Sequence, residues 1–384
     1  MDRSNPLSLD LDRVKTPCFV VDKQALKRNL AILQDVQDRT GCRILLALKG
    51  FAMFSVFPLL RQTLWGVCAS SPHEARLGRD FRGEVHTFAA AYSEDHLESL
   101  VQYSDVLVFN SFSQWQRFRS SVQDAPASIA CGIRVNPEHS EGKVPLYDPC
   151  ASGSRLGMRR EQFEGQDLKG ISGLHFHTLC EHNADALART LSVFEEKFGT
   201  FLPSMKWVNF GGGHHITRGD YDVDLLCSLI QKFMSRYPIK IYLEPGEAVA
   251  LNAGVLVTTV LDIVHNDMPI AILDTSVPTH MPDVLEMPYR PEVAGARMPG
   301  ETPHTYRLAG ISCLAGDVVG EYAFDHPLHV GQKLVFQDMA HYTMVKTTTF
   351  NGVHLPSIAL YDSDVDSYTL VREFGYEDYR SRLS

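Results

Sequence analysis

The feature of this sequence that most restricts its fold is a repeated alternation between residues 43 and 244. Eight short runs of apolar and β-branched residues occur there, and most are followed by a longer segment of helical periodicity. Glycine, proline or a helix-capping residue marks the changes. Eight such steps favour a closed parallel (β/α)8 barrel of the TIM type, and a doubly wound sheet is the alternative. The predicted strands are Arg43–Lys49, Trp65–Ala69, Val85–Ala90, Asp105–Asn110, Ile129–Val135, Ile171–His177, Lys206–Phe210 and Ile239–Glu244.

A second, β-rich pattern begins after Leu251. We expect a barrel over residues 22–262 and a C-terminal β domain, a barrel or a sandwich, over residues 263–384. The run Pro17–Val21 also reads as a strand, which precedes a helix capped by Asp22, and residues 1–21 are expected to contribute this strand to the second domain. The strands predicted in that domain are Val255–Val264, Ile270–Asp274, Tyr306–Ile311, Lys333–Gln337 and Tyr342–Thr348.

Charge and cysteine content limit the compartment and the partners. The chain has 36 basic and 46 acidic side chains, a formal net charge of −10, and no Lys/Arg-rich run, so nucleic acid and anionic membranes are not expected partners. A small cationic ligand would be electrostatically favoured. The N-terminus shows no signal or transit peptide, and no apolar run is long enough to span a membrane. The eight cysteines include no C-x-x-C pair, which predicts reduced thiols in the cytoplasm.

Polar residues at the carboxyl ends of barrel strands are the first candidates for chemistry, because barrel active sites lie there. Lys49 ends the first predicted strand. It could simply mark the step into solvent, or it could be a desolvated amine with a lowered pKa that forms a Schiff base. His175 and His177 end the sixth strand on one face, and His214 and His215 follow the seventh. Each could be a core histidine or a metal ligand, but no third ligand has a recognised spacing and no metal is predicted.

Two loops at the same end are suited to an anionic ligand. Gly211, Gly212 and Gly213 follow the seventh strand, where barrels commonly bind phosphate through backbone N–H groups. Glu244 and Gly246 belong to the Glu-Pro-Gly sequence after the eighth strand. A carboxylate and two such loops suit a ligand that has both a phosphate and a protonatable ring nitrogen. Pyridoxal 5′-phosphate is such a ligand, since it needs a lysine, an acidic partner and a glycine cradle.

This order of motifs resembles that of the fold-type III pyridoxal-phosphate decarboxylases, which include ornithine and diaminopimelate decarboxylases. The resemblance continues with Cys313, Asp317 and Tyr342 and covers nearly the whole chain. It implies an N-terminal barrel and a C-terminal β domain, arranged as in alanine racemase. It also implies a homodimer in which Cys313 and Asp317 reach the cofactor of the neighbouring subunit.

The same resemblance implies a role for each matching residue. Lys49 would bind the cofactor aldehyde, His177 would stack on the ring, Glu244 would pair with the pyridinium, and Tyr342 would bind the phosphate. The substrate α-carboxylate would leave as carbon dioxide while the ring accepts the electrons. Cys313 would then donate a proton to Cα.

Departures from the pattern suggest the substrate. Glu247 replaces the arginine that follows Glu-Pro-Gly in ornithine and diaminopimelate decarboxylases, and the segment after Asp274 carries Asp283 and Glu286. These features resemble the carboxynorspermidine decarboxylase subgroup, which implies conversion of carboxynorspermidine to norspermidine or of carboxyspermidine to spermidine. The ammonium groups of the substrate would then be bound by four carboxylates. These are Glu247, Asp283, Asp274 and Asp317.

Other interpretations remain open at the level of sequence. Asp283 and Glu286 could be solvated loop residues. Loop residues Thr178–Glu181 replace the small Gly-Ser pair of the relatives, which leaves phosphate contacts there open. The enzyme could decarboxylate diaminopimelate, ornithine or lysine, or it could be a racemase of the same fold type. A non-catalytic pyridoxal-phosphate carrier and a metal-dependent barrel hydrolase that uses His175, His177 and His214 are the remaining alternatives.

Overall fold

Residues 7–142 and 144–384 are described by the structure, a computed structural model. The chain forms two compact units: residues 29–249, and the segment up to residue 28 together with residues 250–384. We expected the boundaries at residues 22 and 262. The difference arises because the long strand that begins at Gly254 pairs wholly within the second unit. Within the described part of the chain, no helix has the length and apolar character needed to cross a membrane.

The first unit is a closed barrel of eight parallel strands, which confirms the predicted fold class. Each predicted strand is present, with ends that differ by a few residues, and β9 closes the ring by pairing with β2. The strands are β2 Arg43–Ala47, β3 Gly66–Ala69, β4 Glu84–Phe88, β5 Val106–Phe109, β6 Ala130–Arg134, β7 Ile171–His175, β8 Trp207–Asn209 and β9 Lys240–Leu243.

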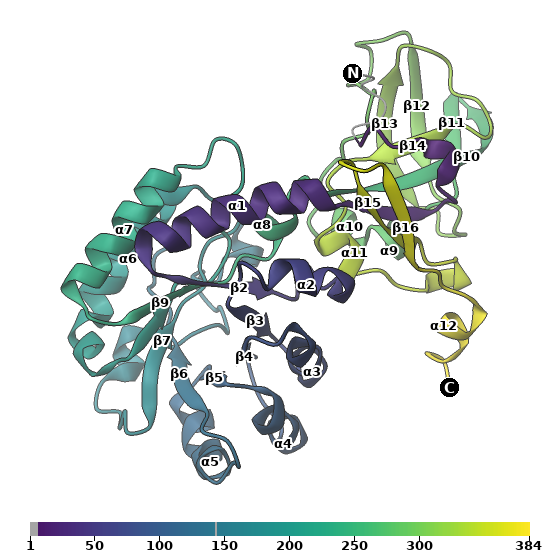
Figure 1. The fold of residues 1–384 in the computed structure, drawn as a ribbon. Helices are drawn as coiled ribbons and strands as arrows, with labels where there is room; N and C mark the ends of the chain where they lie inside the picture. Colours follow the sequence, from purple (N-terminus) through teal and green to yellow (C-terminus); the bar gives the residue numbers. More distant parts are fainter. Residues whose placement is uncertain (1–6, 143) are drawn as a thin grey trace. The chain divides into compact units, whose positions relative to one another are not determined.

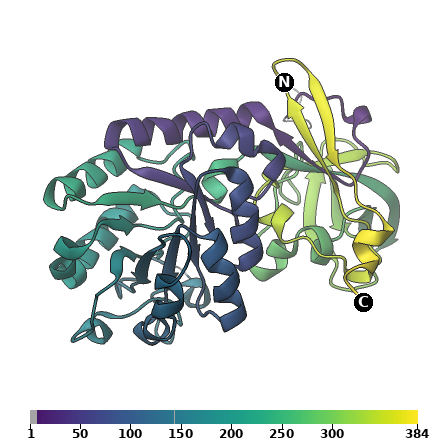
Figure 2. The same ribbon diagram turned by 60° about the horizontal axis from the view of Figure 1, so that its bottom comes forward.

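Helices surround this barrel, as Figure 1 and the turned view in Figure 2 show. Several begin a few residues after a strand ends, because a serine or aspartate caps the free N–H groups of their first turn. Ser71, Ser93, Ser111 and Asp222 each accept a hydrogen bond from the backbone N–H three residues later. The helices are α1 Lys23–Thr40, α2 Phe57–Leu60, α3 Pro72–Phe81, α4 Glu94–Tyr103, α5 Phe112–Gln123, α6 Ala184–Phe198, α7 Val223–Arg236 and α8 Glu247–Ala250.

Trp207 fills much of the barrel interior. Its indole lies where side chains at positions 132 and 173 would project: a Cβ on Gly132 would lie 2.4 Å from the Trp207 ring and one on Gly173 would lie 2.1 Å from it. Trp207 packs in one buried cluster with Leu45, Val108 and other apolar side chains. The centre of the barrel around Trp207 is therefore a packed core.

The second unit is a mostly antiparallel sheet with the strand order β13-β12-β11-β10-β1-β15-β16, in which β14 also pairs with β10. Strand β1, Cys18–Asp22, lies antiparallel to β10 and parallel to β15. Residues 1–6 of the segment expected to supply this strand lie outside the described residues. The other strands are β10 Gly254–Asn266, β11 Met268–Leu273, β12 His304–Ala309, β13 Val318–Phe324, β14 Lys333–Phe336, β15 Ser357–Asp362 and β16 Ser367–Arg372.

One predicted strand is wrong and three strands were not predicted. The segment Tyr342–Thr348 begins with a helical turn, α11 Tyr342–Val345, in which Lys346 N–H bonds to the Tyr342 carbonyl. Its threonines suggested a strand, but burial of Thr343 and Met344 on one side of the turn decided the conformation. The unpredicted strands are β13, β15 and β16. The remaining helices are α9 Val277–His280, α10 Pro282–Glu286 and α12 Tyr376–Arg380.

Candidate active site

Side chains from five barrel strands converge at the carboxyl ends of these strands. Glu244 follows β9, and its carboxylate, about 11% exposed, is the centre of this group. Asn209 Nδ2 donates to Glu244 Oε1 over 2.7 Å, and His175 Nε2 lies 3.2 Å from Oε2. Burial would raise the pKa of Glu244, but His175, together with the nearby His86 and Asn209, outweighs it and lowers the pKa to about 2. Glu244 is thus a buried, ionised carboxylate.

His175 is a partner of Glu244. It is 2% exposed, and its ring centroid lies 5.6 Å from that of Phe88 inside the barrel. Burial lowers the pKa of His175, so the neutral ring donates its Nε2–H to Glu244. Within residues 7–142 and 144–384, no group of three or more His, Cys, Asp or Glu side chains is placed to hold a metal ion.

His177 lies two residues beyond, in the loop after β7, and is fixed by the glycine turn. Gly212 N–H donates to His177 Nδ1 over 2.9 Å. Burial and the positive charges of Lys49 and Arg134 lower the pKa of His177 well below its usual range, so the ring is neutral. A neutral imidazole whose Nδ1 is already occupied can offer its flat face to an aromatic ligand.

The triple glycine is required by backbone geometry. Gly211 and Gly213 have φ of +72° and +79°, and a Cβ on Gly213 would lie 1.9 Å from the Leu179 carbonyl oxygen. Two of the three N–H groups are already used: Gly211 donates to Asn209 Oδ1 over 2.8 Å and Gly212 donates to His177. Two of the three N–H groups thus have partners within the barrel unit, and the phosphate contact expected of this turn stays a prediction.

Lys49 lies in the turn after β2, where Gly50 N–H bonds back to the Ala47 carbonyl. The lysine side chain is exposed. Its charge is nevertheless close enough to lower the pKa of His177. Gly246 lies beside this turn, because a Cβ on Gly50 would be 2.9 Å from Gly246 Cα. The close approach of these two loops requires both glycines.

Arg134, at the end of β6, is a site residue that the sequence analysis missed. It is 5% exposed, donates from Nη2 to the His177 carbonyl over 3.0 Å, and has its guanidinium 4.5 Å from the centre of the Phe88 ring. Burial lowers the pKa of Arg134 to about 10, a value at which it stays charged at neutral pH. A lone arginine inside an otherwise apolar predicted strand was the signal that could have identified it.

His214 and His215, which follow β8, lie in two different environments. His214 is buried with Nδ1 3.4 Å from the Tyr221 hydroxyl, and burial lowers its pKa to about 4. His215 points elsewhere, with Nε2 3.3 Å from Glu247 Oε2. The Glu247 carboxylate, about 21% exposed, therefore has a histidine beside it in the barrel unit.

The other candidates belong to the second unit. Cys313 is exposed, in the loop between β12 and β13, and its N–H donates to Asn351 Oδ1. Asp317 is 3% exposed, and both of its carboxylate oxygens are occupied: Oδ1 by Val277 N–H, and Oδ2 by the N–H and hydroxyl of Ser312. The expectation that Asp317 binds a substrate amine is not supported, because this carboxylate holds the loop that carries Cys313.

Asp274 is occupied in the same way. Its Oδ1 accepts from the Thr258 hydroxyl and Thr259 N–H, and its Oδ2 accepts from the Thr16 hydroxyl. This carboxylate joins three segments of the sheet, so the expected contact with a substrate amine is not supported either.

Asp283 differs, since one of its oxygens is open. It is 7% exposed in α10, and Oδ2 accepts from the hydroxyls of Tyr289 and Thr343. Its Oδ1 is buried and has no hydrogen-bond partner among the described residues. Glu286 pairs with Lys346 at the surface. Tyr342, the expected phosphate ligand, begins α11 and has the Lys346 ammonium 5.7 Å from its ring centre.

Comparison with known proteins first defines the class. Diaminopimelate decarboxylase from Helicobacter pylori, solved with L-lysine, has a TM-score of 0.81 at 17% identity and covers 97% of this chain and 98% of its own, which shows a shared fold. A family model described as pyridoxal-dependent decarboxylase, C-terminal sheet domain, matches residues 18–340. The chain therefore belongs to the pyridoxal-dependent decarboxylases and is a pyridoxal-phosphate enzyme.

More similar relatives narrow the class. The carboxyaminopropylagmatine decarboxylase of Synechocystis is 47% identical, with 97% of this chain and 96% of that protein covered. The carboxynorspermidine/carboxyspermidine decarboxylase of Campylobacter jejuni is 44% identical, with coverage of 97% and 99%. The crystal structure of carboxynorspermidine decarboxylase from Campylobacter jejuni, complexed with norspermidine, has a TM-score of 0.90 at 44% identity and covers 96% of this chain and 100% of that one.

The barrel residues suit pyridoxal phosphate by their chemistry. An exposed lysine at a strand end can react with an aldehyde, and an ionised buried carboxylate can pair with a protonated pyridine nitrogen. The neutral His177 ring provides a flat apolar face. These three features satisfy three different requirements of one ligand.

Proposed function

We propose that this enzyme removes the α-carboxylate of a carboxylated polyamine, converting carboxynorspermidine to norspermidine or carboxyspermidine to spermidine. Similarity at 44% identity over nearly the full length of the Campylobacter jejuni enzyme is the observation that carries this proposal. The reaction belongs to polyamine biosynthesis. Carboxyaminopropylagmatine is the second candidate substrate, because the Synechocystis relative is 47% identical.

The barrel residues bind and orient the cofactor in this proposal. Lys49 would hold the cofactor through its aldehyde, Glu244 would pair with its protonated pyridine nitrogen, and His177 would lie against one face of its ring. When bound, pyridoxal phosphate supplies an electron-accepting ring conjugated to the substrate Cα. Gly213, Gly246 and Tyr342 are the residues that would contact its phosphate.

Cys313 completes the reaction by protonating the substrate. Its Sγ–H donates a proton to Cα after carbon dioxide has left, and the thiol is exposed and therefore accessible to a substrate. Asp317 acts through it, by holding the loop of Ser312 and Cys313 in place.

Two carboxylates are proposed to bind the amines of the polyamine tail. The open Oδ1 of Asp283 is a buried acceptor, and a buried carboxylate oxygen without a partner favours an ammonium ligand. Glu247 provides a second negative charge in the barrel unit. Asp274 and Asp317 are not part of this set.

We further propose that the enzyme works in the cytoplasm as a homodimer with shared active sites, and not with nucleic acid or a membrane. All eight cysteines are free thiols in the structure, as expected for a reducing compartment.

A comparison of kcat/KM for carboxynorspermidine, carboxyspermidine, carboxyaminopropylagmatine, diaminopimelate, ornithine and lysine tests the proposal. We expect a carboxylated triamine to exceed the three amino acids by at least about 100-fold, whereas the two triamines differ by one methylene, worth about 10- to 200-fold. Highest activity with carboxyaminopropylagmatine would favour the second candidate substrate over the carboxylated triamines. Highest activity with ornithine, lysine or diaminopimelate, or racemisation without release of carbon dioxide, would contradict both.

A further inference from the structure

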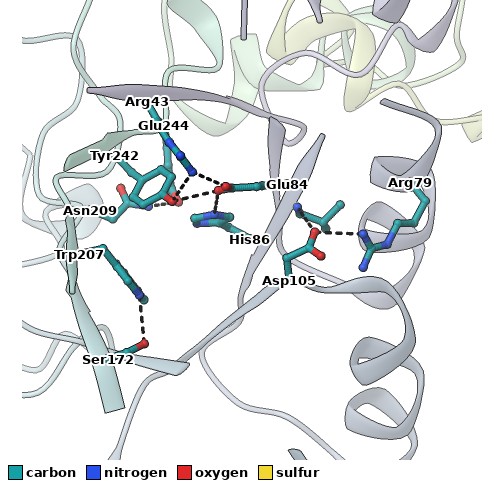
Figure 3. Close-up of polar contacts among 11 residues, drawn as sticks. Arg43, Arg79, Glu84, His86, Asp105, Ser172, Trp207, Asn209, Tyr242 and Glu244 are labelled. Carbon is teal, nitrogen blue, oxygen red and sulfur yellow. Dashed lines mark hydrogen bonds and ion pairs between the residues drawn. The ribbon is translucent and has the colours of Figure 1, made fainter. Parts of the chain in front are cut away.

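Two polar clusters of the barrel unit lie outside the residues assigned to the reaction. The first surrounds Glu84 at the amino end of β4 (Figure 3). Tyr242 OH donates to Glu84 Oε2 over 3.0 Å, Arg43 Nη1 donates to Oε1, and His86 Nε2 lies 3.1 Å from Oε2. Both oxygens of this carboxylate are therefore occupied, and the cluster joins strands β2, β4 and β9 to one another.

The second cluster surrounds His182, in the loop between β7 and α6 at the carboxyl end of the barrel. Both ring nitrogens are bonded: Cys180 N–H donates to Nδ1 over 3.0 Å, and Nε2 lies 2.9 Å from the Glu141 carbonyl oxygen. A backbone N–H can only donate and a carbonyl can only accept, so the ring carries its hydrogen on Nε2 and donates it to Glu141. The His182 side chain therefore joins the loop after β7 to the loop after β6.

Glu141 is a firm attachment point for this side chain. Its carboxylate, about 12% exposed, accepts one hydrogen bond of 2.8 Å from Arg189 Nε and another of 2.8 Å from Nη2, and it lies 2.7 Å from His139 Nε2. The hydrogen bonds from Arg189 lower the pKa of Glu141, so the carboxylate is ionised. Two parallel bonds from one guanidinium fix orientation as well as position. Glu141 is thus held against α6, which carries Arg189.

The bond from Cys180 to His182 closes a turn around Glu181. Glu181 has a φ of +57°, a left-handed conformation that is unfavourable for a residue with a Cβ. The hydrogen bond between Cys180 N–H and His182 Nδ1 spans this residue, and Arg218 Nη1 donates to the Glu181 carbonyl over 3.1 Å. The His182 side chain therefore helps to maintain a loop shape that the backbone alone does not favour.

The backbone of His182 holds the glycine turn that follows β8. His182 N–H donates to the Gly213 carbonyl over 3.0 Å, and the His182 carbonyl accepts from His215 N–H over 3.2 Å. The two loops are in close contact, since a Cβ on Gly213 would lie 1.9 Å from the Leu179 carbonyl oxygen. Unlike the N–H groups of the two preceding glycines, Gly213 N–H has no hydrogen-bond partner in the described part of the chain. A displacement of His182 would therefore move a free donor.

We propose that His182 is a positioning residue for the cofactor phosphate: its side chain fixes the loop after β7, and this loop holds Gly213 with its N–H free to bind a phosphate oxygen. A backbone N–H that is held in place before the ligand arrives binds it more tightly than one that must first be ordered. This inference rests on the proposed contact between Gly213 and the phosphate and is independent of the substrate.

Affinities for pyridoxal phosphate and for pyridoxal, which lacks the phosphate, distinguish a lost phosphate contact from a general loss of structure. Absorbance titration of the full-length apoenzyme with each compound measures the two dissociation constants. Each compound is compared between proteins, so differences in the solution chemistry of the two aldehydes cancel. His182→Ala should weaken binding of pyridoxal phosphate at least about 10-fold and change that of pyridoxal by less than about 3-fold, since a misplaced N–H loses a hydrogen bond to a charged group.

Two conservative variants each keep one of the two side-chain bonds. His182→Asn places an acceptor near the position of Nδ1, and His182→Gln places a donor near that of Nε2. Both should lose less affinity for pyridoxal phosphate than His182→Ala, and they provide the measurement if the alanine variant does not fold. His96→Ala, at an exposed histidine on α4, is the matched control and should bind both compounds as the wild type does.

Two results would overturn the proposal. One is wild-type affinity for pyridoxal phosphate in every His182 variant that folds. The other is an equal loss of affinity for both compounds, which would show that His182 supports the structure alone. A wild-type protein that binds pyridoxal as tightly as pyridoxal phosphate would also contradict the proposed phosphate contact of Gly213, whereas a phosphate preference that the His182 variants retain would contradict only the role of His182.

Discussion

Asn209 donates a hydrogen bond from Nδ2 to Oε1 of Glu244 over 2.7 Å, and its Oδ1 accepts the N–H of Gly211 over 2.8 Å. One carboxamide, 1% exposed, thus fixes both the carboxylate and the glycine turn that follows β8. In the proposed function, Glu244 would pair with the pyridine nitrogen of the cofactor and the glycine turn would lie near its phosphate. Asn209 therefore sets the distance between them.

Asn209→Asp should weaken cofactor binding at least about 10-fold. The new carboxylate would repel Glu244 and would no longer donate to its Oε1, at a cost of about 1–3 kcal/mol, while it could still accept the Gly211 N–H. An absorbance titration of apoenzyme with pyridoxal phosphate measures the dissociation constant. Asn266→Asp, at an exposed position at the end of β10, is the control and should bind the cofactor as the wild type does. Equal affinities for all three proteins would show that the carboxamide is not needed.

Glu244 should contribute to stability in a pH-dependent way. Folding lowers its pKa from 4.5 to about 2, so the folded state favours the ionised form. The stabilisation is fully present above pH 4.5 and is lost as the pH falls toward 2. The difference in unfolding free energy between wild-type and Glu244→Gln apoenzyme, from urea denaturation, should therefore shrink below pH 4.5. Glu377→Gln at the surface should show no such trend; a difference for Glu244→Gln that grows with acid would contradict the assignment.

Inactive variants at Lys49 and Cys313 should restore activity to each other in mixed dimers if the active sites are shared between subunits. Lys49→Ala should lose the visible absorbance of the bound cofactor and at least about 1,000-fold in kcat, since it removes the covalent attachment. Cys313→Ala should keep the absorbance and lose activity. Mixed and refolded, the two chains should recover up to about a quarter of the wild-type activity, because one of the two sites in each heterodimer is intact. Heterodimers that form without any activity would contradict shared sites.

Substitutions at Asp283 and Asp317 should have different effects, the first on substrate binding and the second on stability. Asp283→Asn should raise KM for a carboxylated triamine about 10-fold or more, because the open Oδ1 would lose its charge. Asp317→Asn should lower Tm, since its two oxygens accept three hydrogen bonds, one from Val277 N–H in α9 and two from Ser312 in the loop. Glu286→Gln, at a surface pair with Lys346, is the control and should change neither quantity. An unchanged KM in Asp283→Asn would remove this residue from the substrate site.

Local patterns were sufficient for the barrel. A period of two in the strands, a period near 3.6 in the helices and capping residues such as Ser71 and Asp222 act over a few residues, so they are visible in the sequence. The same holds for Lys49, Glu244 and the glycines, whose positions at strand ends follow from the strands themselves. The segment Tyr342–Thr348 was misjudged because tertiary burial of Thr343 and Met344 outweighed a weak β propensity.

The partners of the polar side chains were decided only by the tertiary structure. Asn209 meets Glu244 across 35 residues and Tyr242 meets Glu84 across 158, and no local pattern records such a contact. Asp274, Asp283 and Asp317 look alike in the sequence, yet two have every oxygen occupied by neighbouring donors and one keeps an oxygen open. The sequence by itself determined which chemical groups stand at the barrel end. The closure of the barrel and the packing of the sheet determined which of those groups are ionised, which are neutral and which are free to bind, because charge and hydrogen bonding depend on burial and on neighbours brought together from distant parts of the chain.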